Sequence, residues 1–164
     1  MLNSLVEDLQ KLRNPQKAKI LSKFFKTGKG EYGEGDIFLG ITVPQTRSIA
    51  KKYTNLDQKD IKKLLSSKIH EHRLIALLIL IENYKKANIR CKNSIFNFYV
   101  KNTKFINNWD LVDLSAPHIV GNFLLDRNKS ILYDLAKSSN LWEKRIAIIS
   151  TFAFIRVNKF EHTL

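Results

Sequence analysis

Apolar residues recur every three or four positions along most of the chain, which is the spacing of one face of an α-helix. The predicted helices span residues 2–12, 15–25, 43–53, 57–65, 70–84, the region around 95–99, 109–116, 118–125, 131–136 and 142–155. No stretch alternates convincingly between apolar and polar residues, so no strand is predicted. The chain is therefore expected to be all-α.

Residues with known positional preferences mark several ends of these helices. Pro44 suits the first turn of a helix, where a missing N–H leaves no bond unmade. Asp57 and Asn140 have side chains that cap a helix N-terminus. Pro117 is expected to close the helix before it. Residues 28–40 hold five of the six glycines, a density that predicts a loop.

The arrangement of the helices favours a repeat architecture. Residues 74–81 are apolar on nearly all sides, which is typical of a helix covered by neighbours. Helices come in pairs at roughly the 40-residue period of HEAT-type repeats. We expect one α-helical repeat domain over residues 1–164, a HEAT-like solenoid, with an irregular helical bundle as the alternative.

The charge of the chain points to an anionic partner. Lys and Arg number 28 against 15 Asp and Glu, a formal net charge of +13. Nucleic acid is the favoured partner, and a basic surface tuned only for solubility is the alternative. Cys91 is the only cysteine, which fits a reducing compartment. The longest apolar run is residues 74–81, so we expect no membrane partner and a cytoplasmic location, nucleoid-associated when DNA is bound.

Two stretches resemble familiar motifs, but one fails on its context and the other on its spacing. Residues 28–33 read G-x-G-x-x-G, yet a helix precedes them and more loop follows, whereas a dinucleotide site needs a strand before and a helix after. His70 and His72 are two positions apart, whereas a zincin helix needs histidines four apart. We therefore expect no metal site and no cofactor.

One constellation of residues carries a functional signal. Trp109 and Asp113 are four apart, so they are expected to project side by side from one helix. Arg145 lies one turn beyond Trp142 and can share its face, and a solenoid could bring both helices to one groove. An arginine fork suits phosphate and tryptophan stacks on bases. The cations of this groove would be Lys101, Lys104, Lys144 and Arg145. The alternative is that Trp109 is core, Asp113 solvated or capping, and Arg145 an ordinary surface residue.

Five parts of the sequence together resemble the HEAT-repeat DNA alkylation repair glycosylases, a family that removes 3- and 7-alkylated purines. The matching parts are residues 25–36, 38–47, 70–73, 108–113 and 142–148, in the family's order. Each alone is weak, and the ordered set is specific. The family is typically longer by one or two helical repeats, so the resemblance implies a solenoid that lacks the C-terminal repeats.

The resemblance assigns roles residue by residue. Asp113 stands where the family has its catalytic carboxylate, and Trp109 where it has the aromatic against the backbone of the damaged nucleotide. Arg145 matches the arginine that holds phosphate near the lesion. Phe24 falls about where the family often has a cleft aromatic, in place of a tyrosine. The expected catalytic residues are thus Asp113 and Trp109, and the expected DNA-binding residues are Arg145, Trp142, Lys144, Phe24 and Lys104.

The implied activity is hydrolysis of the N-glycosidic bond of cationic alkylpurines in duplex DNA. A purine alkylated at N3 or N7 is already a good leaving group, and positive charge develops on the deoxyribose as the bond breaks. Asp113 would stabilise that charge and position water. Two alternatives stay open: a non-catalytic binder of damaged or branched DNA, and a helical-repeat scaffold for protein interactions.

Overall fold

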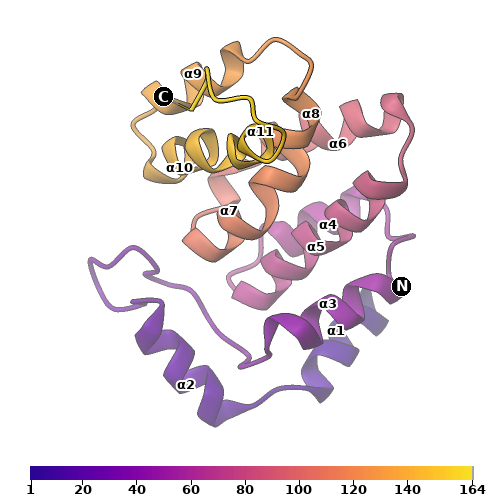
Figure 1. Cartoon of the computed structure of the whole chain (residues 1–164). Helices are drawn as coiled ribbons and strands as arrows, with labels where there is room; N and C mark the ends of the chain where they lie inside the picture. The colour runs from indigo at the N-terminus through magenta and orange to yellow at the C-terminus, as the bar shows by residue number, and fades with distance from the viewer. Residues whose placement is uncertain (164) are drawn as a thin grey trace. The chain divides into compact units, whose positions relative to one another are not determined.

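The computed structural model describes residues 1–163, and all of its regular elements are helices (Figure 1). They are α1 (Leu2–Lys11), α2 (Pro15–Phe24), α3 (Val43–Lys52), α4 (Gln58–Leu65), α5 (His70–Lys86), α6 (Ile89–Lys101), the 3-10 turn η1 (Thr103–Phe105), α7 (Trp109–Ala116), the π-helical turn η2 (Pro117–Gly121), α8 (Asn122–Leu124), α9 (Ser130–Lys137), α10 (Leu141–Ser150) and α11 (Phe152–Ile155). The described residues contain one isolated β-bridge, Ile37 to Ile69, and no strand. The all-α prediction is confirmed. The HEAT-like period and the single domain over residues 1–164 stay predictions. Leu164, the last residue of that predicted domain, lies outside the described residues.

The chain divides into two compact units, Met1–Glu82 and the part from Asn83 onward. In the first unit, α1 and α3 lie side by side (Figure 1). Leu5 and Leu9 of α1 are fully buried. The Tyr53 hydroxyl donates to Asp8 of α1 at 2.9 Å and so ties the end of α3 to its neighbour.

Several helix starts form as the sequence predicts. The Asp57 side chain accepts from Asp60 N–H and begins α4. The Asn140 side chain accepts from Trp142 N–H and begins α10. Pro44 lies in the first turn of α3. These starts depend only on neighbours in the sequence, which is why pattern alone finds them.

The glycine-rich loop is held by a carboxylate from α5. Glu71 is 1% exposed and accepts hydrogen bonds from the backbone N–H groups of residues 39, 40 and 41 at 2.8–3.2 Å. Gly40 has a φ of +83°, and a Cβ there would lie 2.2 Å from the carbonyl oxygen of Asn14. The loop therefore has a structural anchor, with no helix opening on it as a dinucleotide site requires.

In the second unit, α10 contacts α7, α9 and α11 (Figure 1). Its Ile146 is fully buried, as are Leu111 and Val112 of α7. A Cβ on Gly121 would lie 2.2 Å from the carbonyl oxygen of Ser150, so only glycine permits this close approach of η2 to α10. The buried faces of α7 and α10 thus fix the two helices against each other.

The predicted end of α7 is confirmed, because α7 stops at Ala116, directly before Pro117. The chain stays helical beyond it, since Pro117 has φ of −62° and ψ of −35° and begins the wider turn η2, which leads into α8. The extent of the last predicted helix is wrong. The expected single helix over residues 142–155 is broken at Thr151, whose N–H and hydroxyl both bond the Ile148 carbonyl at 3.1 and 2.7 Å.

Candidate functional site

The candidate site is centred on an ion pair between α7 and α10. Arg145 donates from Nε to Asp113 Oδ1 at 2.8 Å and from Nη2 to Asp113 Oδ2 at 2.7 Å. Both side chains are partly exposed, Arg145 by 38% and Asp113 by 35%. The hydrogen bond to Asp113 raises the pKa of Arg145, so its guanidinium stays charged. The pair is both ordered and accessible to a ligand.

A buried network fixes α7, which carries Asp113. Ser115 donates from its hydroxyl to the Leu111 carbonyl at 2.5 Å and lies 2.8 Å from the Tyr99 hydroxyl, which must then donate to it. Tyr99 is fully buried. Burial raises its pKa, and the negative charge of Asp113 adds to that shift, so the phenol stays neutral. This network fixes the helix two residues before and two residues after Asp113.

A second network fixes the start of α10, which carries Arg145. Glu143 accepts from the Thr103 hydroxyl at 2.6 Å and from the Ser138 hydroxyl at 2.5 Å. It therefore joins η1 and the segment before α10 to the first turn of the helix. A carboxylate in the first turn is also favoured by the helix dipole.

Trp109 begins α7 and is partly buried, one turn before Asp113. The preceding residue, Asn108, is fully buried, and neither polar atom of its side chain has a hydrogen-bond partner among the described residues. Asp110 is 7% exposed and accepts from Leu111 N–H at 2.7 Å. The aromatic and the carboxylate singled out by spacing are thus on one helix, as expected.

The other predicted DNA-binding residues have different settings. Trp142 is partly buried in the first turn of α10, and Lys144 is exposed on the same helix. Lys104 is exposed, and its ammonium lies 5.0 Å from the Phe105 ring centroid. Phe24 belongs to the first unit, is 61% exposed at the end of α2, and packs edge-on against Phe25. Asp113 and Arg145 are the two predicted residues between which the structure shows a direct bond.

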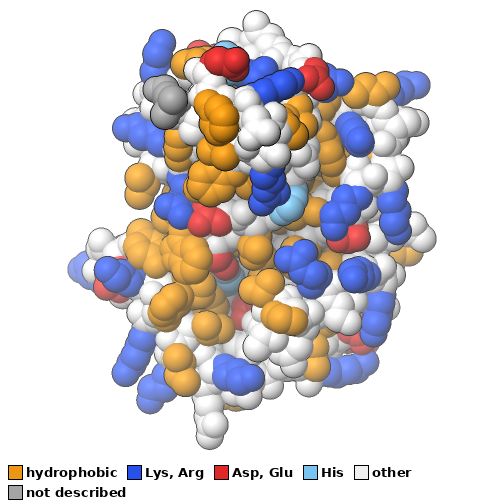
Figure 2. Space-filling model, in the orientation of Figure 1, with side chains coloured by type: hydrophobic (Ala, Val, Ile, Leu, Met, Phe, Trp, Pro, Cys, Tyr) orange, Lys and Arg blue, Asp and Glu red, His pale blue; other side chains and the backbone are white. Residues whose placement is uncertain are grey.

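Positive side chains are scattered over the face shown in Figure 2, with no single stripe. Charge distribution on this face therefore does not mark the site. Among residues 1–163, no group of three or more His, Cys, Asp or Glu side chains is arranged to hold a metal ion. No helix in the same range is long and apolar enough to cross a membrane.

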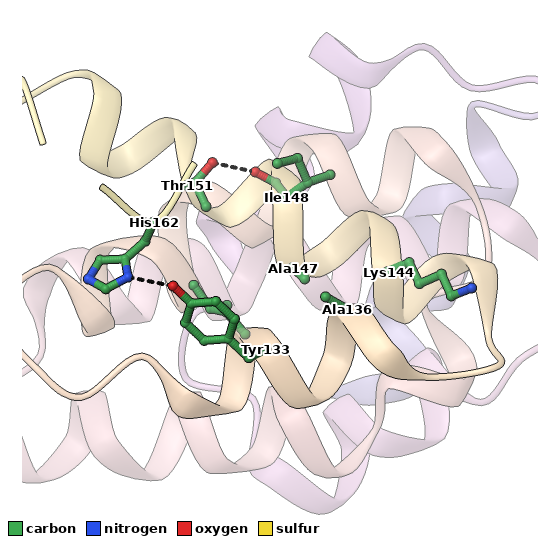
Figure 3. A pocket seen from close by; sticks show the side chains of 8 residues that line it. Tyr133, Ala136, Lys144, Ala147, Ile148, Thr151 and His162 are labelled. Atoms are coloured by element: carbon green, nitrogen blue, oxygen red, sulfur yellow. Dashed lines mark hydrogen bonds between the residues drawn. The ribbon is translucent and has the colours of Figure 1, made fainter. Parts of the chain in front are cut away.

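A pocket of about 150 Å³ lies between α9, α10 and the segment after α11 (Figure 3). The Tyr133 hydroxyl lies 2.9 Å from His162 Nδ1 at its rim, and Lys144 extends away from this pair. The floor is apolar, formed in part by Ala147 and Ile148. Neither Asp113 nor Arg145 lines this pocket, so it is distinct from the candidate site.

Sequence reasoning missed the residues that support the site. Tyr99 and Ser115 are 16 positions apart, and Thr103 and Glu143 are 40 apart, so no local spacing connects them. One signal was present: Glu143 is three residues after the capping Asn140, where carboxylates favour the first turn of a helix.

Comparison with known proteins adds a family and a fold. The family described as DNA alkylation repair enzyme matches residues 5–164. A solved structure described as a predicted DNA alkylation repair enzyme from Enterococcus faecalis is similar, with a TM-score of 0.63 and 14% sequence identity. The alignment covers 92% of this chain and 70% of that one. No curated protein matches the sequence.

Proposed function

Since this chain belongs to the DNA alkylation repair enzyme family, a family of repair enzymes, we propose that it is a DNA glycosylase. It would hydrolyse the N-glycosidic bond of cationic N3- and N7-alkylated purines in duplex DNA. The observation that carries the proposal is the Asp113 carboxylate, which is 35% exposed, rigidly held, and one helical turn from Trp109.

The chemistry requires little from the protein. An alkylated purine is cationic and leaves without protonation, so the main task is to stabilise the positive charge that grows on the deoxyribose. A fixed carboxylate does this and can also orient the attacking water. An aromatic face beside the sugar adds roughly 0.5–2 kcal/mol. In this proposal Asp113 is the carboxylate and Trp109 the aromatic.

Arg145 would have two roles. Its fork holds both oxygens of Asp113 and so sets the direction of the carboxylate. Its Nη1 forms no hydrogen bond with any residue in the described part of the chain, so this nitrogen can donate to a phosphate near the lesion. Each Asp113 oxygen keeps a lone pair for water or the sugar.

The remaining predicted residues would contact DNA outside the chemical step. Lys104 and Lys144 are exposed cations suited to phosphates, while Trp142 and Phe24 offer aromatic faces. We assign them to binding and not to the chemical step.

One observation favours a second candidate function. Both oxygens of Asp113 already accept from Arg145, as they would in a purely structural ion pair. On that reading the protein binds damaged or branched DNA without cleaving it. DNA binding would then persist with no release of any base.

Release of 7-methylguanine from alkylated duplex DNA tests the proposal. Asp113→Asn keeps the size of the side chain and removes its charge. We expect release to fall by about 100-fold or more, the usual effect of deleting one transition-state stabiliser, with DNA affinity retained. Asp134→Asn, the same change at an exposed position on α9, is the control and should release base at the parent rate. Equal release by the parent and Asp113→Asn would reject the catalytic role of Asp113.

A further inference from the structure

The second unit begins with a stretch of sequence that carries only positive charge. Between Asn83 and Asn108 there is no Asp or Glu, and there are six basic residues: Lys85, Lys86, Arg90, Lys92, Lys101 and Lys104. Half of this stretch forms α6, which lies beside α8 (Figure 1). The charge of α6 is therefore not balanced by acidic neighbours in the sequence.

Four polar residues form one stripe along α6. Their side chains are exposed and spaced by three or four positions, which places them on one face of the helix: Arg90, Asn93, Asn97 and Lys101. The two cations at its ends are about 16 Å apart along the helix axis, since each residue adds about 1.5 Å. Among the described residues, none of these four side chains forms a hydrogen bond or an ion pair. The α6 stripe thus has an unpaired cation at each end and two amides between them.

The opposite face of α6 holds the stripe in place. Ile95, Phe96 and Tyr99 are buried, and Phe96 stacks on Phe123 with ring centroids 4.3 Å apart. The Tyr99 hydroxyl lies 2.8 Å from the Ser115 hydroxyl of α7. The stripe therefore lies on a fixed helix and not on a loop.

The stripe and the candidate site face away from each other. Lys101 follows Tyr99 by two residues, a rotation of about 200°, so it points away from α7 and does not line the groove with Asp113 as the sequence predicts. On α7, Asp113 precedes Ser115 by two residues and points away from α6 by the same rotation. A duplex bound at Asp113 therefore leaves the stripe open to another molecule.

The N-terminal end of the stripe favours an anion for a second reason. Arg90 lies in the first turn of α6, which contains no acidic residue. The helix dipole places partial positive charge at this end, so a cation there is unfavourable by itself. The Asn88 side chain caps one N–H of the turn, that of Cys91. A carboxylate bound here would interact with both Arg90 and the end of the helix.

We propose that the α6 stripe binds an acidic segment of a protein partner in an extended conformation. An extended chain rises about 3.3 Å per residue, so carboxylates five residues apart match the spacing of the two cations. The amides of Asn93 and Asn97 can each donate to a peptide carbonyl and accept from a peptide N–H, both of which an extended segment leaves unpaired. A phosphate backbone offers acceptors only and would use only the donor half of each amide. The stripe therefore fits an acidic peptide better than a nucleic-acid strand.

This inference goes beyond the proposed function and does not depend on it. Binding of a peptide to α6 requires neither base release nor DNA. A chain that releases no base can still bind the peptide, and an active glycosylase can fail to bind it. The two proposals therefore fail separately.

The experiment measures the affinity of the full chain for a labelled synthetic peptide, Asp-Glu-Thr-Ser-Thr-Asp-Glu, by fluorescence anisotropy at low salt. Arg90→Gln with Lys101→Gln removes both cations of the stripe. We expect this variant to bind at least about tenfold more weakly, the effect of losing two exposed ion pairs. Lys137→Gln with Arg156→Gln makes the same change in net charge at exposed positions elsewhere in the second unit and should keep the parent affinity.

Two further variants separate contacts from general attraction and from misfolding. Asn93→Ala with Asn97→Ala changes no charge and should weaken binding severalfold. Arg90→Lys with Lys101→Arg keeps both charges and should bind like the parent. One equivalent of unmodified duplex should leave the affinity for the peptide unchanged, because the two ligands take different faces.

Three results would overturn the proposal. Equal losses in the two glutamine variants would show that only net charge matters. Displacement of the peptide by the duplex would show that both compete for one surface. No binding of the peptide to the parent, with weaker binding of the duplex to the glutamine variant of the stripe, would assign the α6 stripe to nucleic acid.

Discussion

Each unit of the molecule holds an aspartate–arginine pair, and the two pairs differ chiefly in exposure. In the first unit Arg73 pairs with Asp36, and these side chains are 4% and 5% exposed. In the second, Arg145 and Asp113 are 38% and 35% exposed. The same two residue types therefore occur once inside the protein and once at its surface.

The buried pair has partners only within the protein. Arg73 also donates to the Ser67 carbonyl at 2.8 Å, and His70 Nδ1 lies 3.7 Å from Asp36. The His70 ring stacks on two buried aromatic rings, with ring-centroid distances of 4.5 Å to Phe38 and 5.2 Å to Phe25. Burying two charges is favourable only when they are paired with each other. Arg73 Nε is buried with no hydrogen-bond partner among the described residues, but both side chains of the pair are closed to solvent, so the first pair is structural.

The exposed pair is held in place by the protein and still has polar atoms that can bond to a ligand. Its two hydrogen bonds satisfy one side of the carboxylate and two of the three guanidinium nitrogens. An exposed ion pair contributes little to stability, about 0–1 kcal/mol. The exposed pair contributes little to folding, yet two hydrogen-bond networks, at Tyr99–Ser115 and at Glu143, fix the helices that carry it. This contrast with the buried pair favours a role in binding or catalysis.

The largest expected effect is the loss of stability when the arginine of the buried pair is replaced, compared with the same replacement in the exposed pair. Arg73→Met keeps the length of the side chain but leaves Asp36 buried without its cation. We expect the free energy of unfolding to fall by about 3–5 kcal/mol. Arg145→Met, the matched change in the exposed pair, should cost no more than about 1 kcal/mol. Urea denaturation followed by circular dichroism measures both.

A similar loss for the two methionine variants would break the comparison. It would mean that Asp113–Arg145 is held for stability, and its functional assignment would lose its main physical support. The double variant Asp36→Leu with Arg73→Met is informative as well, since replacing a whole buried pair by apolar residues is often neutral.

The parts of this fold that the sequence predicts are those decided locally. Asp57 and Asn140 accept from backbone N–H groups three and two residues away, and Pro44 lies in the first turn, so each of these helices begins where expected. Pro117 shows the limit of local rules. Its ring is compatible with a wider π-turn, and the close contact of Gly121 with Ser150 that accompanies this turn is a tertiary feature.

Only the part of the candidate site that lies on one helix could be predicted from the sequence. Trp109 and Asp113 share a helix, so their spacing is enough to place them on one face. Arg145 is 32 residues further on, and its two bonds to Asp113 depend on how α7 packs against α10. Residues 70–73 make the same point. Their spacing was enough to argue against a zinc site, but it could not predict their hydrogen-bond partners. Glu71 and Arg73 bond to Leu39 and Asp36 in the loop, and His72 bonds to Ser67, which precedes α5.

A smaller effect sharpens the role of the exposed pair. Arg145→Lys keeps the positive charge and loses the planar fork that holds both Asp113 oxygens. We expect release of 7-methylguanine to fall by about tenfold, the size of one lost charged hydrogen bond of roughly 1.5 kcal/mol, with DNA affinity changed much less. Single-turnover release and equilibrium binding separate the two quantities. A loss of affinity equal to the loss of rate would assign Arg145 to phosphate binding alone.

The smallest effect concerns the pH dependence of the first unit. His72 is 8% exposed, its Nδ1 lies 3.2 Å from the Ser67 hydroxyl, and its Nε2 is buried without a partner among the described residues. Burial lowers the pKa of His72, and the negative charge of Glu71 offsets part of that shift. Below about pH 6.5 the unfolded chain therefore binds a proton that the folded chain does not.

That difference makes stability fall as the pH drops from 6.5 towards the lower pKa of folded His72, whereas above pH 6.5 it has no effect. We expect the parent to lose more stability than His72→Gln between pH 7.5 and 5.5, measured by urea denaturation at each pH. Parallel curves for the two proteins would show that His72 does not resist protonation in the folded state. A steeper curve for the parent would show that folded His72 resists protonation, so that the interior of the first unit, unlike the exposed pair of the second, loses stability when a charge is forced into it.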